Sequence, residues 1–300
     1  MNNPKADVAT SFDSFIELDK GSDLIHLSDV DIEYFKANLE WVLTIDKSYM
    51  LCLKPKGKTS GTNTRASTGQ NSTEVAHGRR PAVLAIVGYV TPENFKFTPE
   101  GNHYITKEEE NQKPFSKAKA MFDIICPPAP ETAPVNSWWK KYLSAATLLQ
   151  NVAPSIAHRS RKGFVAGEAL RMGYKLFEEI SPAIESAEDR NTHLRTLKDW
   201  PVGPKFKDSC LELGCSFKPR TSPIFDLDKP VAPVEWKAKL PAAEVRVCFT
   251  LNYWRIGRAD ASFTASVEEV HVVKDSAPII IEKRKADDGL PQFSSPKKRK

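Results

Sequence analysis

The sequence of 300 residues predicts an α+β protein with a small β-barrel core, a helical insert and long loops. Two observations predict this fold. Residues 245–273 contain two long alternating segments around a turn with one glycine, which indicates a β-hairpin. Between residues 136 and 200, apolar residues recur at helical spacing, which indicates the insert. The apolar content of 40% is sufficient for a real core.

The first strand of the hairpin alternates apolar and mostly polar residues. Its apolar side consists of Val245, Val247, Phe249, Leu251 and Tyr253. In the second strand the apolar phase shifts by one residue after Glu268 and Glu269, as expected for a β-bulge. Bulges supply the curvature that closes a small barrel. By phase, Tyr253 faces the core and Trp254 faces the opposite side.

With the upstream segment 223–228, the hairpin resembles the C-terminal part of the OB-fold single-stranded DNA-binding proteins of large DNA viruses and phages. The shared order is a Pro-Ile-Phe-Asp entry, a spacer, a strand containing Tyr253 and Trp254, and a second apolar strand. The resemblance implies an OB-like barrel that coats single-stranded DNA without strong sequence preference. It also implies a role in the replication or recombination of a viral genome.

The remaining elements are predicted from local patterns. Residues 1–22 are expected to form a flexible arm, and Ser28, followed by Asp31, to cap a helix that carries Ile32, Phe35 and Leu39, with Trp41 near its end. Strands are expected at residues 41–53, 81–92 and 121–126, with the first two paired to each other. Residues 58–80 are almost free of apolar side chains and predict a long loop. Helices are expected at residues 138–149, 164–180 and 183–200.

The net charge of +5 is concentrated at the carboxyl end. Residues 276–300 contain seven basic and three acidic residues, a net of +4, which leaves about +1 (5 − 4) for residues 1–275. Any nucleic-acid surface on the body must therefore be a local patch rather than a general property of its charge.

Aromatic and basic residues interleave in the C-terminal half, and this is the mix that stacks bases and binds phosphates. The candidate nucleic-acid-binding residues there are Lys205, Phe206, Lys207, Phe217, Lys218, Arg220, Trp236, Lys237, Arg246, Tyr253, Trp254, Arg255 and Arg258. Trp254 is the preferred stacking residue because it faces away from the core. A separate basic cluster of Arg159, Arg161 and Lys162 precedes a predicted helix, where a phosphate can bind.

Two basic clusters near the C-terminus form a bipartite pattern of the kind that nuclear import receptors bind. They consist of Lys283, Arg284 and Lys285, and of Lys297, Lys298, Arg299 and Lys300. The pattern predicts a nuclear protein with a disordered tail, domain boundaries at about 22 and 275, and an import receptor as partner. Ser295, followed by Pro296, resembles a proline-directed kinase site, and a phosphate there would oppose the adjacent cations.

No catalytic pattern is visible. The histidines are scattered, zinc-site spacings are absent, and five widely spread cysteines indicate a reducing compartment. We therefore expect a protein that is not an enzyme, needs no cofactor and does not span a membrane; homo-oligomerisation stays open. Two alternatives remain: a nuclear assembly protein that meets nucleic acid only through its tail, and a metal-dependent nuclease that uses Asp226 and Asp228.

Overall fold

The computed structural model describes residues 24–55, 78–104, 113–128, 134–180, 187–214 and 216–274. The predicted arm, most of the predicted 58–80 loop, and the tail with its import signal and Ser295 lie outside the described residues. In the part of the chain that is described, no helix has the length and apolar character needed to cross a bilayer.

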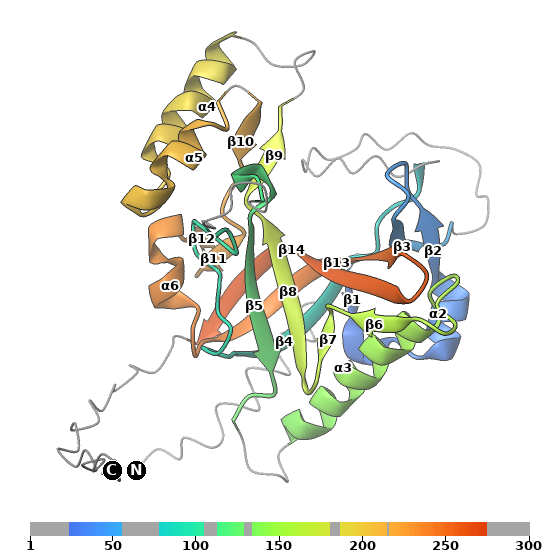
Figure 1. The fold of residues 1–300 in the computed structure, drawn as a ribbon. Helices are drawn as coiled ribbons and strands as arrows, with labels where there is room; N and C mark the ends of the chain where they lie inside the picture. The colour runs from blue at the N-terminus through green and yellow to red at the C-terminus, as the bar shows by residue number, and fades with distance from the viewer. Residues whose placement is uncertain are drawn as a thin grey trace, which may run out of the picture.

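The structure is mixed α/β, with a large mixed sheet flanked by helices (Figure 1). The described α-helices are α2 (Ile32–Asn38), α3 (Pro134–Asn151), α4 (Ala187–Asp199), α5 (Lys207–Leu211) and α6 (Trp236–Lys239). The strands are β1 (Ile25–His26), β2 (Leu39–Leu43), β3 (Tyr49–Leu53), β4 (Leu84–Val90), β5 (Lys119–Ile125), β6 (Ser160–Lys162), β7 (Val165–Ala166), β8 (Ala169–Lys175), β9 (Phe177–Glu179), β10 (Phe217–Pro219), β11 (Ile224–Asp226), β12 (Lys229–Pro230), β13 (Glu244–Ile256) and β14 (Asp260–Lys274).

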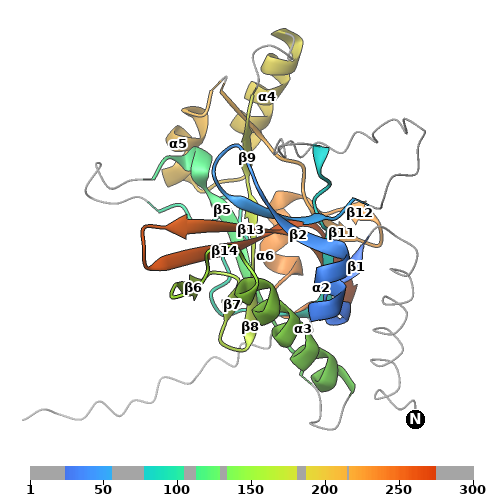
Figure 2. The same cartoon turned by 90° about the vertical axis from the view of Figure 1, so that its right-hand side faces the viewer.

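Five strands of the large sheet pair in a closed order. β4 pairs with β5, β5 with β8, β13 with β4, and β13 with β14, all antiparallel. β14 pairs in parallel with β8, so the pairings return to the strand from which they start. β3 and β2 extend the sheet from the distal half of β13, and β11 and β12 extend it beside β14 (Figure 2).

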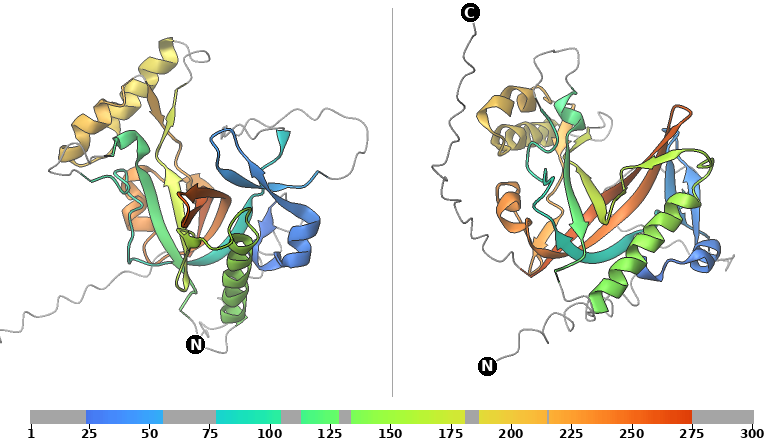
Figure 3. Two further views of the ribbon diagram at one scale, coloured as in Figure 1. Left: turned by 45° about the vertical axis from the view of Figure 1, so that its right-hand side comes forward. Right: turned by 60° about the horizontal axis from the view of Figure 1, so that its bottom comes forward.

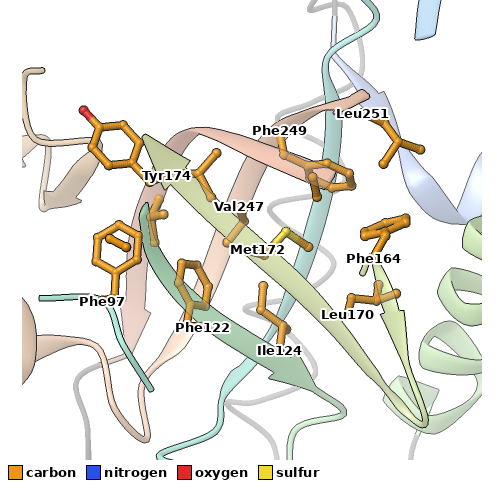
Figure 4. Packing of buried hydrophobic residues seen from close by; sticks show 14 of the residues in the cluster. Phe97, Phe122, Ile124, Phe164, Leu170, Met172, Tyr174, Val247, Phe249 and Leu251 are labelled. Atoms are coloured by element: carbon orange, nitrogen blue, oxygen red, sulfur yellow. The ribbon is translucent and has the colours of Figure 1, made fainter. Parts of the chain in front are cut away.

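The core lies inside this ring of strands. Side chains of β5, β8 and β13, among them Phe122, Met172 and Phe249, point toward one another between the strands (Figure 4). The rings of Phe97 and Trp236 lie 5.0 Å apart and bring α6 against the core. α3 covers a different side of the strands from α6 (Figure 3).

Two local predictions are confirmed. The hairpin forms with a bulge at the predicted place, because Cys248 is opposite Glu269 whereas Phe249 is opposite Val267, which makes Glu268 the extra residue of the bulge. Asp31 is the N-cap of α2, where its carboxylate accepts a hydrogen bond of 2.7 Å from the Tyr34 amide.

Two other predictions are wrong, and a third holds only in part. Residues 164–180 form β7, β8 and β9 instead of a helix, so the helical part of the 136–200 insert is limited to α3 and α4. Alanine, leucine, arginine and methionine favour helices locally, but pairing of this segment with β5 and β14 overrides the preference. The predicted strand 41–53 is two strands, β2 and β3. The predicted pairing of 81–92 with 41–53 is limited to its start, where Pro81 pairs with Cys52 and the Ala82 amide donates to the Leu51 carbonyl, whereas β4 itself pairs with β13 and β5.

Candidate nucleic-acid interface

The turn of the β13–β14 hairpin brings together two cationic segments that are far apart in sequence. β6 pairs in parallel with the start of β14, and the Ser160 amide donates a 2.8 Å hydrogen bond to the Ala259 carbonyl. This pairing places three residues of the 159–162 segment beside the tip of the hairpin, where Arg255 lies at the end of β13 and Arg258 lies in the turn. We call the five residues Arg159, Arg161, Lys162, Arg255 and Arg258 the tip cluster.

The tip cluster is strongly positive. Segments 159–162 and 255–260 contain five basic residues and one acidic residue, a net of +4 (5 − 1), against about +1 for residues 1–275 as a whole. Lys162 forms an ion pair of 3.0 Å with Asp260 while its side chain stays 59% exposed. Arg161, Arg255 and Arg258 are exposed. The cluster therefore offers several cations to a polyanion at one place.

Gly163 and Arg159 hold the cluster in place. Gly163 has a φ of +105°, and a Cβ on it would lie 2.2 Å from the Phe263 carbonyl oxygen, so only glycine lets the chain after β6 run this close to β14. The Arg159 Nη1 donates hydrogen bonds of 2.9 and 3.0 Å to the carbonyl oxygens of Gly257 and Asp260. The turn is thus tied to β6 by side-chain as well as main-chain contacts.

The hairpin separates its two neighbouring aromatic residues. Trp254 is half-buried and lies opposite Ser262, on the side of the hairpin away from the core. Tyr253 is fully buried, stacks on Phe263 at 5.0 Å and donates a 2.7 Å hydrogen bond to the Pro154 carbonyl. The predicted phase is confirmed, but Tyr253 is wrong as a candidate base-stacking residue because burial leaves it no free ring face.

A surface lined by small residues runs from Trp254 to the C-terminal half of β8. Ser262, Thr264 and Ser266 of β14 are half-exposed on the side that carries Trp254, and Ser266 is paired opposite Gly173 of β8. We call Ser262, Thr264, Ser266 and Gly173 the outer face. Gly173 is itself buried beside its β5 partner Met121, and a Cβ on it would have no neighbour closer than 3.8 Å. A glycine in a strand can mark the close approach of a ligand.

Several predicted binding residues have structural roles instead. Trp236 is fully buried, and its Nε1 donates a 3.0 Å hydrogen bond to Ser222 Oγ. Phe206 is 7% exposed and packs against Phe115, with Lys205 above its ring at 4.7 Å. Neither aromatic side chain has a face available for a base.

The remaining cations of that group bind parts of the fold. The Lys207 Nζ donates a 2.8 Å hydrogen bond to the Trp200 carbonyl, just beyond the end of α4. Lys218 lies 3.5 Å from Glu178, and the guanidinium of Arg220 lies 4.7 Å from the centre of the Tyr174 ring. Phe217 is partly buried against the core. We therefore correct the prediction that these residues form one binding surface with Trp254.

Two other predicted residues lie far from the tip cluster. Arg246 is on the same side of β13 as Trp254, but eight residues of strand place them about 26 Å apart. Lys237 is exposed on α6, near the start of β13, so the strand separates it from the tip by about 40 Å.

The carboxylate pair considered for a nuclease is not a metal site in this arrangement. The Asp226 carboxylate accepts a 2.6 Å hydrogen bond from Lys239 Nζ, and Asp228 lies in the turn after β11 with a φ of +64°. Within the described ranges, no group of three or more histidine, cysteine, aspartate or glutamate residues has metal-binding geometry.

Sequence reasoning missed a second cationic group. Lys119 of β5 is paired directly opposite Lys175 of β8. Burial and the nearby charges of Lys175 and Lys113 lower the pKa of Lys119. We call Lys113, Lys119 and Lys175 the lysine cluster. Sequence separation hides it, because only the β5–β8 pairing brings its members together.

No family model and no curated protein sequence matches the chain. Among solved structures, the chain is similar to gp2.5, a single-stranded DNA-binding protein encoded by bacteriophage T7. The TM-score is 0.32 and the sequence identity is 12%, over 72% of this chain and 98% of the phage protein.

Proposed function

We propose that this protein binds single-stranded DNA, with the tip cluster holding phosphates and Trp254 stacking on a base. The observation that supports this function best is the pairing of β6 with β14, which brings Arg159, Arg161 and Lys162 beside the hairpin that carries Trp254. Single-strand binders without sequence preference combine these two features: cations that follow the backbone and rings that stack on bases.

The architecture is consistent with this function. Five strands that close on themselves through one parallel pair fit the description of an OB-type barrel, and such barrels bind oligonucleotides. We infer that the ring of β4, β5, β8, β14 and β13 is such a barrel. The hairpin that carries the tip cluster is then the loop between its last two strands, one of the loops through which this fold binds nucleic acid.

A titration tests the proposal. Fluorescence anisotropy with labelled oligo(dT), poly(U) and duplex DNA should show binding to single strands that weakens as salt rises. Replacing Arg161 and Arg258 by glutamine should reduce the affinity for oligo(dT) by about tenfold and make the salt dependence less steep. Lys237→Gln is the matched control, because it removes an exposed cation about 40 Å away. Equal losses in both variants would contradict a specific site at the tip.

We also propose that the protein acts in the nucleus, in the replication or recombination of DNA, and that its basic tail binds an import receptor. The support is the bipartite pattern at residues 283–285 and 297–300. Deleting residues 276–300 should abolish nuclear entry while the affinity for oligo(dT) stays within about threefold of the full chain. Loss of DNA binding on deletion would favour a protein that meets nucleic acid only through its tail.

A further inference from the structure

The lysine cluster is an arrangement that a sheet ordinarily avoids. Lys119 and Lys175 are direct cross-strand partners, and like charges in such positions repel each other. Neither residue points into the core, because Ala120, Phe122 and Tyr174 fill the inward positions of the two strands. A third cation, Lys113, lies close enough to affect the ionisation of Lys119.

Within the described residues, none of the three lysines belongs to an ion pair. Four residues along the same strand pair, Arg171 is neutralised by hydrogen bonds of 2.8 and 3.0 Å to the two oxygens of Asp123. The uncompensated positive charge on these strands is therefore concentrated at the lysines.

The lysine cluster lies in line with the tip cluster. Ser262 is paired opposite Trp254, and Ser266 is paired opposite Gly173, two residues before Lys175. The path from Ser262 to Lys175 follows four residues of β14 and two of β8, about 20 Å at 3.3 Å per residue. It crosses the half-exposed side chains of Ser262, Thr264 and Ser266 and passes the buried Gly173. That length corresponds to about six nucleotides at the rise of a B-form strand, and to fewer in an extended one.

We propose that the lysine cluster is a second phosphate-binding site, which holds one end of a single strand whose other end lies on the tip cluster. This inference rests on the proposed function. It adds a path for the DNA across the outer face and a minimum length of the oligonucleotide that spans both clusters. A phosphate between Lys119 and Lys175 converts their repulsion into two attractive contacts. In the free protein the same pair opposes folding, which is a reason to keep it only where an anion binds.

The test compares a Lys119→Gln/Lys175→Gln variant with Lys237→Gln and the wild type. Titrations with labelled oligo(dT) at several salt concentrations should show the slope of log K against log salt reduced by about 0.7 in the double variant, for the one phosphate that the variant no longer neutralises. Oligonucleotides of four to twelve nucleotides should bind the wild type more tightly with length up to about six, and this gain should disappear in the double variant. The melting temperature of the free variant should be equal to or above that of the wild type.

The outcomes separate the two proposals. If the wild type binds oligo(dT) and the double variant keeps its slope and length dependence, the second site is wrong while the proposed function stands. If the wild type does not bind oligo(dT), both proposals are wrong. Lys175→Gln alone, at an exposed position, provides the same readout should the double variant not fold, with a slope reduction of at most about 0.7.

Discussion

The guanidinium of Arg159 donates a 2.9 Å hydrogen bond to the carbonyl oxygen of Gly257, across 98 residues of chain. A second bond, to the Asp260 carbonyl, closes the same turn. Among the cations of the tip cluster, Arg159 thus organises the site, whereas Arg161 is exposed and available to a ligand.

Arg159→Met should lower both the stability and the affinity for oligo(dT). The loss of these hydrogen bonds at a partly exposed site should cost about 1 kcal/mol of folding free energy. Arg161→Met is the matched control and should lower the affinity with no change in melting temperature. Differential scanning calorimetry and anisotropy titrations measure the two effects. Identical behaviour of the two variants would contradict a distinct role for Arg159.

Gly163→Ala should destabilise the protein. The added Cβ would meet the Phe263 carbonyl oxygen at 2.2 Å, and the backbone has a φ of +105°. Strain of this type costs about 1–3 kcal/mol, and displacement of β6 from β14 should add to it. Gly167→Ala is the control: its φ is +65°, but a Cβ there has no neighbour within 4 Å. Urea denaturation should give a much lower free energy of unfolding for Gly163→Ala than for Gly167→Ala. Equal values would show that β6 does not need this close approach to β14.

Gly173→Val should separate stability from binding. The position has ordinary strand geometry and room for a Cβ, so the fold should tolerate the change. Gly173→Ala should even gain about 0.5–1 kcal/mol, because glycine is unfavourable in a strand. The valine side chain would project onto the outer face and should weaken oligo(dT) binding. Unchanged affinity of the valine variant would show that the bound DNA does not cross this position.

Trp254→Ala should weaken oligo(dT) binding by about 5- to 150-fold, which corresponds to 1–3 kcal/mol for one stacked base. Arg246→Gln should leave the affinity nearly unchanged, because Arg246 lies about 26 Å along the strand from Trp254. Quenching of tryptophan fluorescence by the oligonucleotide should be largely lost in Trp254→Ala. Full quenching in that variant would assign the signal to another tryptophan.

The pH dependence should report the lysine cluster. Lys119 has a pKa below its ordinary 10.5 because of burial and the charges of Lys175 and Lys113. A bound phosphate would raise that pKa again, so oligo(dT) affinity should fall as the pH rises through the lowered pKa of Lys119, before ordinary lysines titrate. Stability should change in the opposite sense. Between the lowered pKa and 10.5 the unfolded chain binds more protons than the folded chain, so the free energy of unfolding increases as the pH rises. Lys119→Gln should remove both effects, and persistence of either one would assign it to another group.

Local sequence patterns predicted the elements that depend on neighbours in the chain. The β13–β14 hairpin, its bulge at Glu268 and the cap at Asp31 follow from alternation, phase shift and a side chain that bonds an amide three residues away. The same patterns failed for β8, whose helix-forming composition gave way to pairing with β5 and β14. They also failed for Trp236 and Phe206, because burial depends on residues brought near by the fold.

The sequence by itself determined the hairpin, the outward phase of Trp254 and the basic character of the segments at 159–162 and 255–258. Only the tertiary structure decided that these segments meet, that Lys119 opposes Lys175, and that Lys207, Lys218 and Arg220 contact parts of the fold. The physical reason is range. Alternation and capping act over a few residues, whereas a charge cluster on a sheet depends on which distant strands pair.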